Sequence, residues 1–263
     1  MSIDKFYTKP WVAKMCCELL DLTQYSHILE PSAGAGAFLP YLPSDKTEAI
    51  DLEPDADGIT QMDFFDYKGS PDLVIGNPPF GRVSSLAIKF FNHAATFTDT
   101  IAFIIPRTFR RVSVQNKLDL NFHLSLDAEI PMGSFEPETM KAKCCFQVWK
   151  RKDHKREKVE LPMTHSDFEV LSYKTVNGKV QAPDNVDFAI RAYGSNIGSI
   201  SFDIDEVAPK SFHFIRSPIA EDIIDNFEHL EYYPLASWTA RQDSIGKGEL
   251  ILLYNQYTSK NSS

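Results

Sequence analysis

The chain has 263 residues, enough for one domain of ordinary size with a smaller second lobe, and 43% of them are hydrophobic, as in folded proteins with a substantial core. No apolar run approaches the ~20 residues of a membrane span, and the N-terminus lacks a basic-then-apolar signal pattern. We therefore expect a cytoplasmic protein, with association with a nucleoid or nucleus left open. The net charge of −9 counts against nucleic-acid binding unless positive charge is concentrated locally.

The four cysteines form two adjacent pairs, Cys16–Cys17 and Cys144–Cys145. Neither pair has the spacing of a zinc site, and adjacent side chains on a helix or strand point in different directions. We therefore expect free, buried thiols, with no structural disulfide and no metal.

The first part of the chain alternates short apolar runs with amphipathic segments, which is typical of a layered α/β fold. The expected strands are His27–Leu29, Glu48–Leu52, Leu73–Ile75, Thr100–Ile105, Leu124–Ile130 and Cys144–Lys150. Apolar residues at helical spacing predict helices over Trp11–Leu22 and Ser84–Phe97.

The character of the sequence changes after a basic segment that ends at Lys158. The region Val186–Ile204 is typical of strands with glycine turns, Ile219–Leu230 predicts an amphipathic helix, and Gly248–Tyr254 predicts a final strand. We therefore predict two domains, a catalytic one over residues 1–158 and a target-recognition region over residues 159–263.

Three segments near the start have the composition of a nucleoside-binding site. In H-I-L-E-P-S-A-G-A-G-A-F, Gly34 and Gly36 let the backbone approach a ligand, and Glu30 at the strand end suits a ligand that carries an ammonium group. Asp51, at the end of the next strand, can accept both hydroxyls of a ribose. Asp63 and Phe64 follow, where they could bond to and pack on an adenine ring.

The fourth segment, D-L-V-I-G-N-P-P-F, is a strand that runs into two prolines. The prolines fix the backbone, so the Asn77 amide oxygen and the Pro78 carbonyl oxygen are held as two acceptors. Such a pair would hold both hydrogens of a planar amino group and turn its lone pair toward a methyl donor. Phe80 offers a flat face on which a purine can stack.

The segments F-Y-T-K-P, E-P-S-A-G-A-G, I-D-L-E-P, D-F and N-P-P-F together resemble the N6-adenine DNA methyltransferases. Their order, with the F-Y-T-K-P segment first and the target-reading region last, resembles the gamma arrangement of that family. The resemblance covers roughly residues 5–150. It implies a Rossmann-like class I methyltransferase fold, a seven-stranded, mostly parallel sheet flanked by helices, followed by a small C-terminal α+β lobe. It also implies S-adenosyl-L-methionine as cofactor and DNA as partner.

The resemblance gives each matching residue a role. The cofactor would be bound by Thr8, Pro10, Glu30, Ala33, Gly34, Gly36, Asp51, Asp63, Phe64 and Asn77. The catalytic segment would be Asn77, Pro78, Pro79 and Phe80, acting on an adenine flipped out of the helix. Phe135 and Phe146 are candidates for a second aromatic that closes the far side of the base.

Two basic clusters are candidates for contacts with the phosphate backbone. They consist of Arg107, Arg110 and Arg111, and of Lys150, Arg151 and Lys152. The N-P-P-F element is shared with enzymes that act on adenine or guanine in RNA and on protein glutamine. An amino group in RNA therefore stays open as the alternative target, with protein glutamine as a less favoured one. A non-catalytic cofactor-binding subunit is a further alternative. The sequence predicts neither the recognition site nor the oligomeric state.

Overall fold

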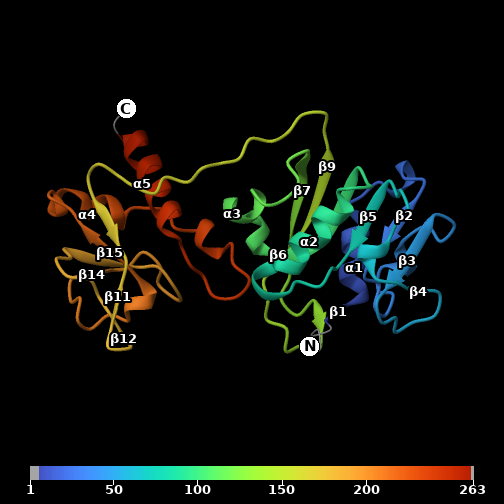
Figure 1. Cartoon of the computed structure of the whole chain (residues 1–263), viewed down its shortest axis with the longest axis horizontal. Coiled ribbons are helices and arrows are strands. Elements are labelled where there is room, and N and C mark those ends of the chain that lie inside the picture. The colour runs from blue at the N-terminus through green and yellow to red at the C-terminus, as the bar shows by residue number, and fades with distance from the viewer. Residues whose placement is uncertain (1–5, 262–263) are drawn as a thin grey trace. The chain divides into compact units, whose positions relative to one another are not determined.

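A computed structural model describes residues 6–261. The chain divides between Lys158 and Val159 into two compact units (Figure 1). Each unit has a hydrophobic core of its own. Within residues 6–261, no helix combines the length and the apolarity that crossing a membrane requires.

The first unit is built on a seven-stranded sheet in the order β4-β3-β2-β5-β6-β9-β7. Its strands are β2 (Ile28–Glu30), β3 (Thr47–Asp51), β4 (Thr60–Gln61), β5 (Leu73–Gly76), β6 (Thr100–Pro106), β7 (Phe122–Ile130) and β9 (Cys144–Arg151). Neighbouring strands are parallel, except that β9 is antiparallel to both β6 and β7. The strand order reverses between β2 and β5, so the loops after these two strands lie at a topological switch point, where ligands bind in such sheets.

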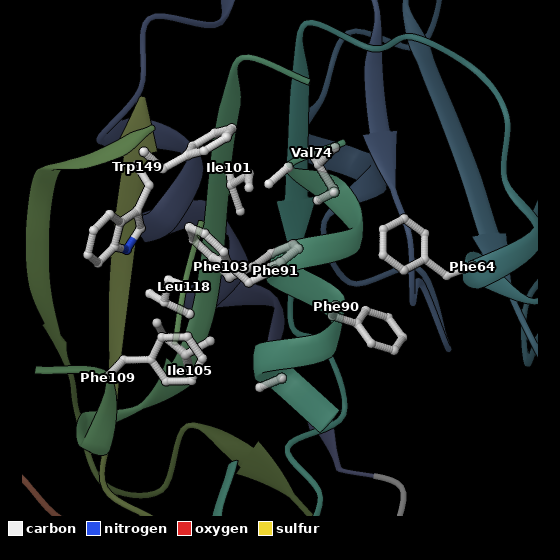
Figure 2. Packing of buried hydrophobic residues seen from close by; sticks show 14 of the residues in the cluster. Phe64, Val74, Phe90, Phe91, Ile101, Phe103, Ile105, Phe109, Leu118 and Trp149 are labelled. Atoms are coloured by element: carbon white, nitrogen blue, oxygen red, sulfur yellow. The ribbon is translucent and has the colours of Figure 1, made fainter. Parts of the chain in front are cut away.

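Helices cover both faces of this sheet. Helix α1 (Pro10–Glu18) packs on one face, and α2 (Ser85–Ala94) with α3 (Val112–Gln115) packs on the other. Figure 2 shows Phe91 of α2 beside Ile101 and Phe103 of β6. The next side chain along β6, Ile104, belongs to the α1 core, because successive side chains of a strand point to opposite faces. The predicted α/β fold, a mostly parallel seven-stranded sheet flanked by helices, is confirmed.

The N-terminal segment is fixed to this unit by a short ladder. Strand β1 (Tyr7–Thr8) pairs with β8 (Phe135–Glu136), which lies in the loop between β7 and β9. The ladder holds the F-Y-T-K-P segment at the edge of the sheet where the parallel strands end.

The second unit is an α+β lobe, as expected. Its four-stranded antiparallel sheet has the order β10-β15-β13-β14, and a separate hairpin joins β11 to β12. The strands are β10 (Glu169–Leu171), β11 (Lys174–Val176), β12 (Lys179–Gln181), β13 (Phe188–Arg191), β14 (Ile200–Ser201) and β15 (Phe212–Arg216). Helices α4 (Ala220–Glu228) and α5 (Lys247–Asn261) supply Phe227, Leu250 and Tyr254 to its core.

The strand predicted over Gly248–Tyr254 is wrong, because this segment belongs to helix α5. A short apolar run fits a buried strand and a buried helix turn equally well. The side chain of Glu249 decides between them, since its Oε2 accepts a hydrogen bond of 2.7 Å from the Gly246 N–H just before the helix. Leu250, Ile251 and Tyr254 then share one buried face.

All four cysteines are free and buried, as predicted. Burial raises the pKa of the Cys144 thiol to about 12. This thiol therefore stays protonated at neutral pH, and it is a packing group rather than a nucleophile.

Candidate functional site

Four segments that are distant in the sequence meet at the carboxyl ends of β2, β3 and β5. The Gly34 N–H donates to Asp51 Oδ2 at 2.8 Å, which joins the glycine loop to the end of β3. The Ser32 hydroxyl donates to the main-chain oxygen of Asn77 at 3.1 Å, which joins the same loop to the N-P-P-F segment. The Asn77 amide donates to the Phe6 carbonyl at 3.4 Å, which adds the N-terminal segment.

The glycine loop needs its glycines for two physical reasons. Gly34 and Gly36 have φ values of 53° and 75°, in the left-handed region. A Cβ on Gly34 would also lie 3.3 Å from the ring of Tyr7. The Tyr7 hydroxyl donates to Asp55 at 2.6 Å, so this ring is tied down beside the loop.

Glu30, the last residue of β2, is a buried carboxylate with an unsatisfied oxygen. The residue is 1% exposed, and its Oε2 has no hydrogen-bond partner within the described part of the chain. Burial, with the nearby charge of Asp51 as the second cause, raises the pKa of Glu30 well above its usual range. A buried carboxylate without a counter-charge is costly, and an ammonium group is the ligand that would satisfy it.

Asp51 braces the glycine loop. Its two oxygens accept from the backbone N–H groups of Gly34 and Glu53, both at 2.8 Å. Each carboxylate oxygen has a second lone pair, so Asp51 can hold the loop and still accept from a ligand hydroxyl.

Asn77 follows β5 and presents a second unsatisfied acceptor. Its Oδ1 is buried without a partner in residues 6–261, while its Nδ2 and its main-chain oxygen are engaged by Phe6 and Ser32. The Phe6 carbonyl can only accept, so it faces the Nδ2 end of the side-chain amide, and the Oδ1 is left for another donor. Pro78 is buried, and Phe80 packs against the cores on both faces of the sheet.

The other predicted cofactor residues lie along the same edge with different exposure. Thr8 is 7% exposed, Pro10 is the exposed first residue of α1, and Ala33 is 6% exposed in the glycine loop. Asp63 is exposed, and its side chain accepts from the Phe65 N–H at 2.9 Å. Phe64 is 2% exposed, so its neighbour Phe65, at 37%, is the more accessible aromatic of this turn.

The ring of Phe64 is enclosed by other aromatic rings. Its centroid lies 4.8 Å from both Phe90 and His93 and 5.9 Å from Phe97. Phe135 and Phe146, the candidates for a second stacking ring, are 4% and 0% exposed and belong to the core under α1. Because these two rings are core residues, neither is available to a base.

The structure does not bring the two predicted basic clusters together. Arg107–Arg110 follows β6 at the same edge as Asn77. Lys150 pairs with Thr100 at the start of β6, because β9 is antiparallel, so Lys150, Arg151 and Lys152 lie at the opposite edge. Arg151 there donates to Asp99 at 2.8 Å and to the carbonyl of Ala95.

The arginines after β6 are partnered by carboxylates of β7. Arg110 donates through Nε to Asp127 at 3.0 Å and through an Nη to Glu129 at 2.5 Å. Arg107 forms an ion pair with the other oxygen of Glu129, also at 2.5 Å. Arg111 is the N-cap residue of α3. Much of the positive charge expected for a phosphate track is thus neutralised within the protein.

We expect Arg110→Ala to lower the free energy of unfolding by about 1–3 kcal/mol, because Asp127 and Glu129 would lose a common partner. Urea denaturation of the full chain measures this change. Lys152→Ala is the matched control: Lys152 is exposed, so its removal should change the free energy by less than about 0.5 kcal/mol. If Arg110→Ala lowered the free energy of unfolding no more than Lys152→Ala does, the structural role of Arg110 would be contradicted.

Sequence reasoning missed Ser32, Tyr7 and Asp55, which connect the four segments. Each lies within or next to a motif that was singled out. Their partners, however, are 45 to 48 positions away. No local signal in the sequence marks such a long-range hydrogen bond.

Comparison with known proteins gives only distant structural similarities. No protein-family profile matches the sequence. No curated protein matches it either. Among solved structures, the 23S rRNA methyltransferase ErmE is similar, with 14% identity, coverage of 57% of this chain and 71% of that chain, and a TM-score of 0.43. The magnesium protoporphyrin IX methyltransferase ChlM from Synechocystis PCC 6803 is 11% identical, covering 54% of this chain and 77% of that one, with a TM-score of 0.41.

Proposed function

We propose that the first unit binds S-adenosylmethionine and methylates the N6 amino group of adenine in DNA, and that residues 159–263 contribute to target recognition. The observation that carries this proposal is the pair of buried oxygens without partners, Asn77 Oδ1 and Glu30 Oε2. Glu30 is the last residue of β2, and Asn77 directly follows β5, the two strands at the switch point of the sheet. The hydrogen bond from Ser32 to Asn77 links the loops after these strands. A buried amide oxygen directly before two prolines fits an amino group, and a buried carboxylate fits an ammonium group.

S-adenosylmethionine, when bound, supplies an electrophilic methyl group. Asn77 Oδ1 and the Pro78 carbonyl would accept the two N–H groups of the target amine, which directs the nitrogen lone pair toward that methyl. The proton can leave after transfer, so no residue has to act as a base beforehand. Positioning by the stiff backbone supplies most of the acceleration.

The remaining residues would orient the two reactants. Glu30 accepts from the ammonium group of the methionine end, and Asp51 accepts from the ribose hydroxyls while it holds the glycine loop. Asp63 is the proposed acceptor for the cofactor adenine. Phe80 gives the flipped target base a surface to stack on.

RNA is a second candidate substrate. The net charge of −9, the neutralised arginines and the displaced lysine segment weaken the case for a long DNA duplex track. They leave a short structured RNA as an acceptable target.

Radiolabelled methyl transfer tests the function and separates the two substrates. The purified full chain would be incubated with methyl-labelled S-adenosylmethionine and with unmethylated DNA or RNA, and the product digested to nucleosides. We expect N6-methyldeoxyadenosine from DNA. Label in N6-methyladenosine alone would assign the enzyme to RNA, and the absence of label in either nucleoside would contradict the proposal.

We expect Asp51→Ala to raise the apparent KM for the cofactor by about 10- to 100-fold, because two backbone N–H groups and the ribose would lose their acceptor. The change in kcat should be small by comparison. Steady-state kinetics over a range of cofactor concentrations measures both constants. An effect confined to kcat would contradict the role assigned to Asp51.

A further inference from the structure

The segment directly after N-P-P-F is strained. Three of its four residues have positive φ: Gly81 at 68°, Val83 at 52° and Ser84 at 60°. Glycine adopts such values freely, but for a β-branched residue they are a genuine outlier. The Val83 side chain is also 83% exposed, so burial within the protein does not offset the strain. Backbone outliers of this kind occur where the surrounding structure imposes them for a function.

Both ends of this segment are firmly anchored. The Phe80 carbonyl accepts from the N–H groups of Leu86 and Ala87 at 3.1 and 3.2 Å. Ser84 is 3% exposed, and its hydroxyl lies 2.7 Å from that of Thr108. These contacts hold Val83 on a fixed backbone.

The anchors also place Val83 between two parts of the proposed site. It is three residues after Phe80, so the two Cα atoms are at most about 11 Å apart. Thr108, which holds the other end, belongs to the basic segment Arg107–Arg110. An exposed apolar side chain is thus held close to the residue on which the target base would stack.

An exposed apolar side chain at this position can assist base flipping. When a base leaves a duplex, the vacated space costs stacking energy, and apolar side chains that enter between base steps offset part of it. Single-stranded DNA has no such gap. A residue with this role is therefore needed on duplex DNA and dispensable on a single strand.

We propose that Val83 is an apolar wedge that enters duplex DNA beside the target adenine and fills the space the base leaves. The neighbouring Arg82 is exposed and supplies a cation for the adjacent phosphate. This inference rests on the proposed methylation of adenine in DNA. It adds that the substrate is a duplex, and it names the residue that stabilises the opened state.

The substitution Val83→Asn tests the wedge. Asparagine accepts positive φ more readily than valine, so the fold should be kept and the thermal unfolding temperature unchanged or raised. The assay is labelled methyl transfer by the full chain into unmethylated DNA, used as a duplex and after heat denaturation, so both forms carry the same targets. We expect transfer into the duplex to fall about tenfold or more, with transfer into denatured DNA within about twofold of the parent protein.

Two further variants control the result. Leu19→Asn removes another exposed apolar side chain, 41% exposed just after α1. It should leave methyl transfer into duplex and denatured DNA unchanged. Val83→Met keeps an apolar side chain and should retain most of the duplex activity. The wedge would be overturned if Val83→Asn lost activity equally on duplex and denatured DNA, or lost it on neither. It would also be overturned if the parent enzyme were active only on denatured DNA. Each of these results would leave adenine methylation in place. A parent protein inactive on both would instead contradict the proposed function.

Discussion

Replacing Asn77 by alanine is expected to lower kcat by about 10²- to 10³-fold, while the affinity for the cofactor changes little. The proposed role of the amide oxygen is to hold the target amino group in line with the methyl donor. Its Oδ1 has no partner in the described structure, so its removal breaks no hydrogen bond of that oxygen. The fold loses only the 3.4 Å hydrogen bond from Asn77 Nδ2 to the Phe6 carbonyl, so the main loss should appear in turnover.

Three measurements separate these effects: steady-state kinetics, calorimetric titration of the cofactor, and thermal unfolding. Asn92→Ala is the matched control in the same unit, because the Asn92 side chain donates to the Lys117 carbonyl and accepts from the Asp119 N–H. That variant should lose stability and keep its turnover. Turnover of Asn77→Ala equal to that of the parent protein would refute the acceptor role of Asn77.

The strands that carry the candidate site could be predicted from the sequence because each is a short apolar run that stops at a glycine, a proline or an acid. The predicted strands His27–Leu29 and Leu73–Ile75 differ from β2 and β5 by one residue at most at each end. In a parallel sheet, residues that follow adjacent strands meet at one edge. The convergence of Glu30, Asp51 and Asn77 follows from that rule.

The position of the lysine segment could not be predicted, because it depends on the direction of one strand. Had β9 run parallel to β6, Lys150 would lie at the same edge of the sheet as Asn77. The antiparallel register instead pairs Lys150 with Thr100 and sends the segment to the other edge. An apolar run predicts a strand equally well in either direction, so the sequence alone does not decide this.

The ion pairs of Arg107 and Arg110 could not be predicted from the sequence either. The partners of Arg110 are 17 and 19 positions away on β7. By local charge alone, Arg107–Arg110 is an unpaired basic cluster. Only the strand order places the carboxylates of Asp127 and Glu129 next to these arginines. Charge clusters in a sequence therefore locate cations without showing whether these cations are available to a ligand.

Replacing Glu30 by glutamine should have opposite effects on binding and on stability. The proposed ion pair with the ammonium group of the cofactor is buried, and removing one partner of such a pair costs about 3–5 kcal/mol. The dissociation constant for the cofactor should thus rise by about 10²- to 10³-fold. Without ligand, the same carboxylate is unpaired, so glutamine should raise the thermal unfolding temperature at neutral pH.

The pH dependence of the parent protein gives an independent test of the same carboxylate. Burial first, and the charge of Asp51 second, raise the pKa of Glu30 in the folded state. The unfolded chain releases this proton near the ordinary carboxyl pKa of about 4.3, whereas the folded protein keeps it to higher pH. Its contribution to stability is therefore complete below about 4.3 and is lost as pH rises through the folded pKa.

Glu30→Gln should remove this decrease of stability with rising pH. In the parent protein, cofactor affinity should increase with pH between about 4.3 and the folded pKa of Glu30, because the ammonium group binds the ionised carboxylate. Glu48→Gln is the control on the neighbouring strand: Glu48 accepts from the Tyr67 hydroxyl at 2.8 Å, a bond that glutamine can keep, so its replacement should not raise the unfolding temperature. Thermal unfolding and cofactor titration from about pH 4 to about pH 8 measure both effects. A lower unfolding temperature for Glu30→Gln at neutral pH, or an unchanged affinity, would show that Glu30 already has a partner in the folded chain and is not held ready for a cation.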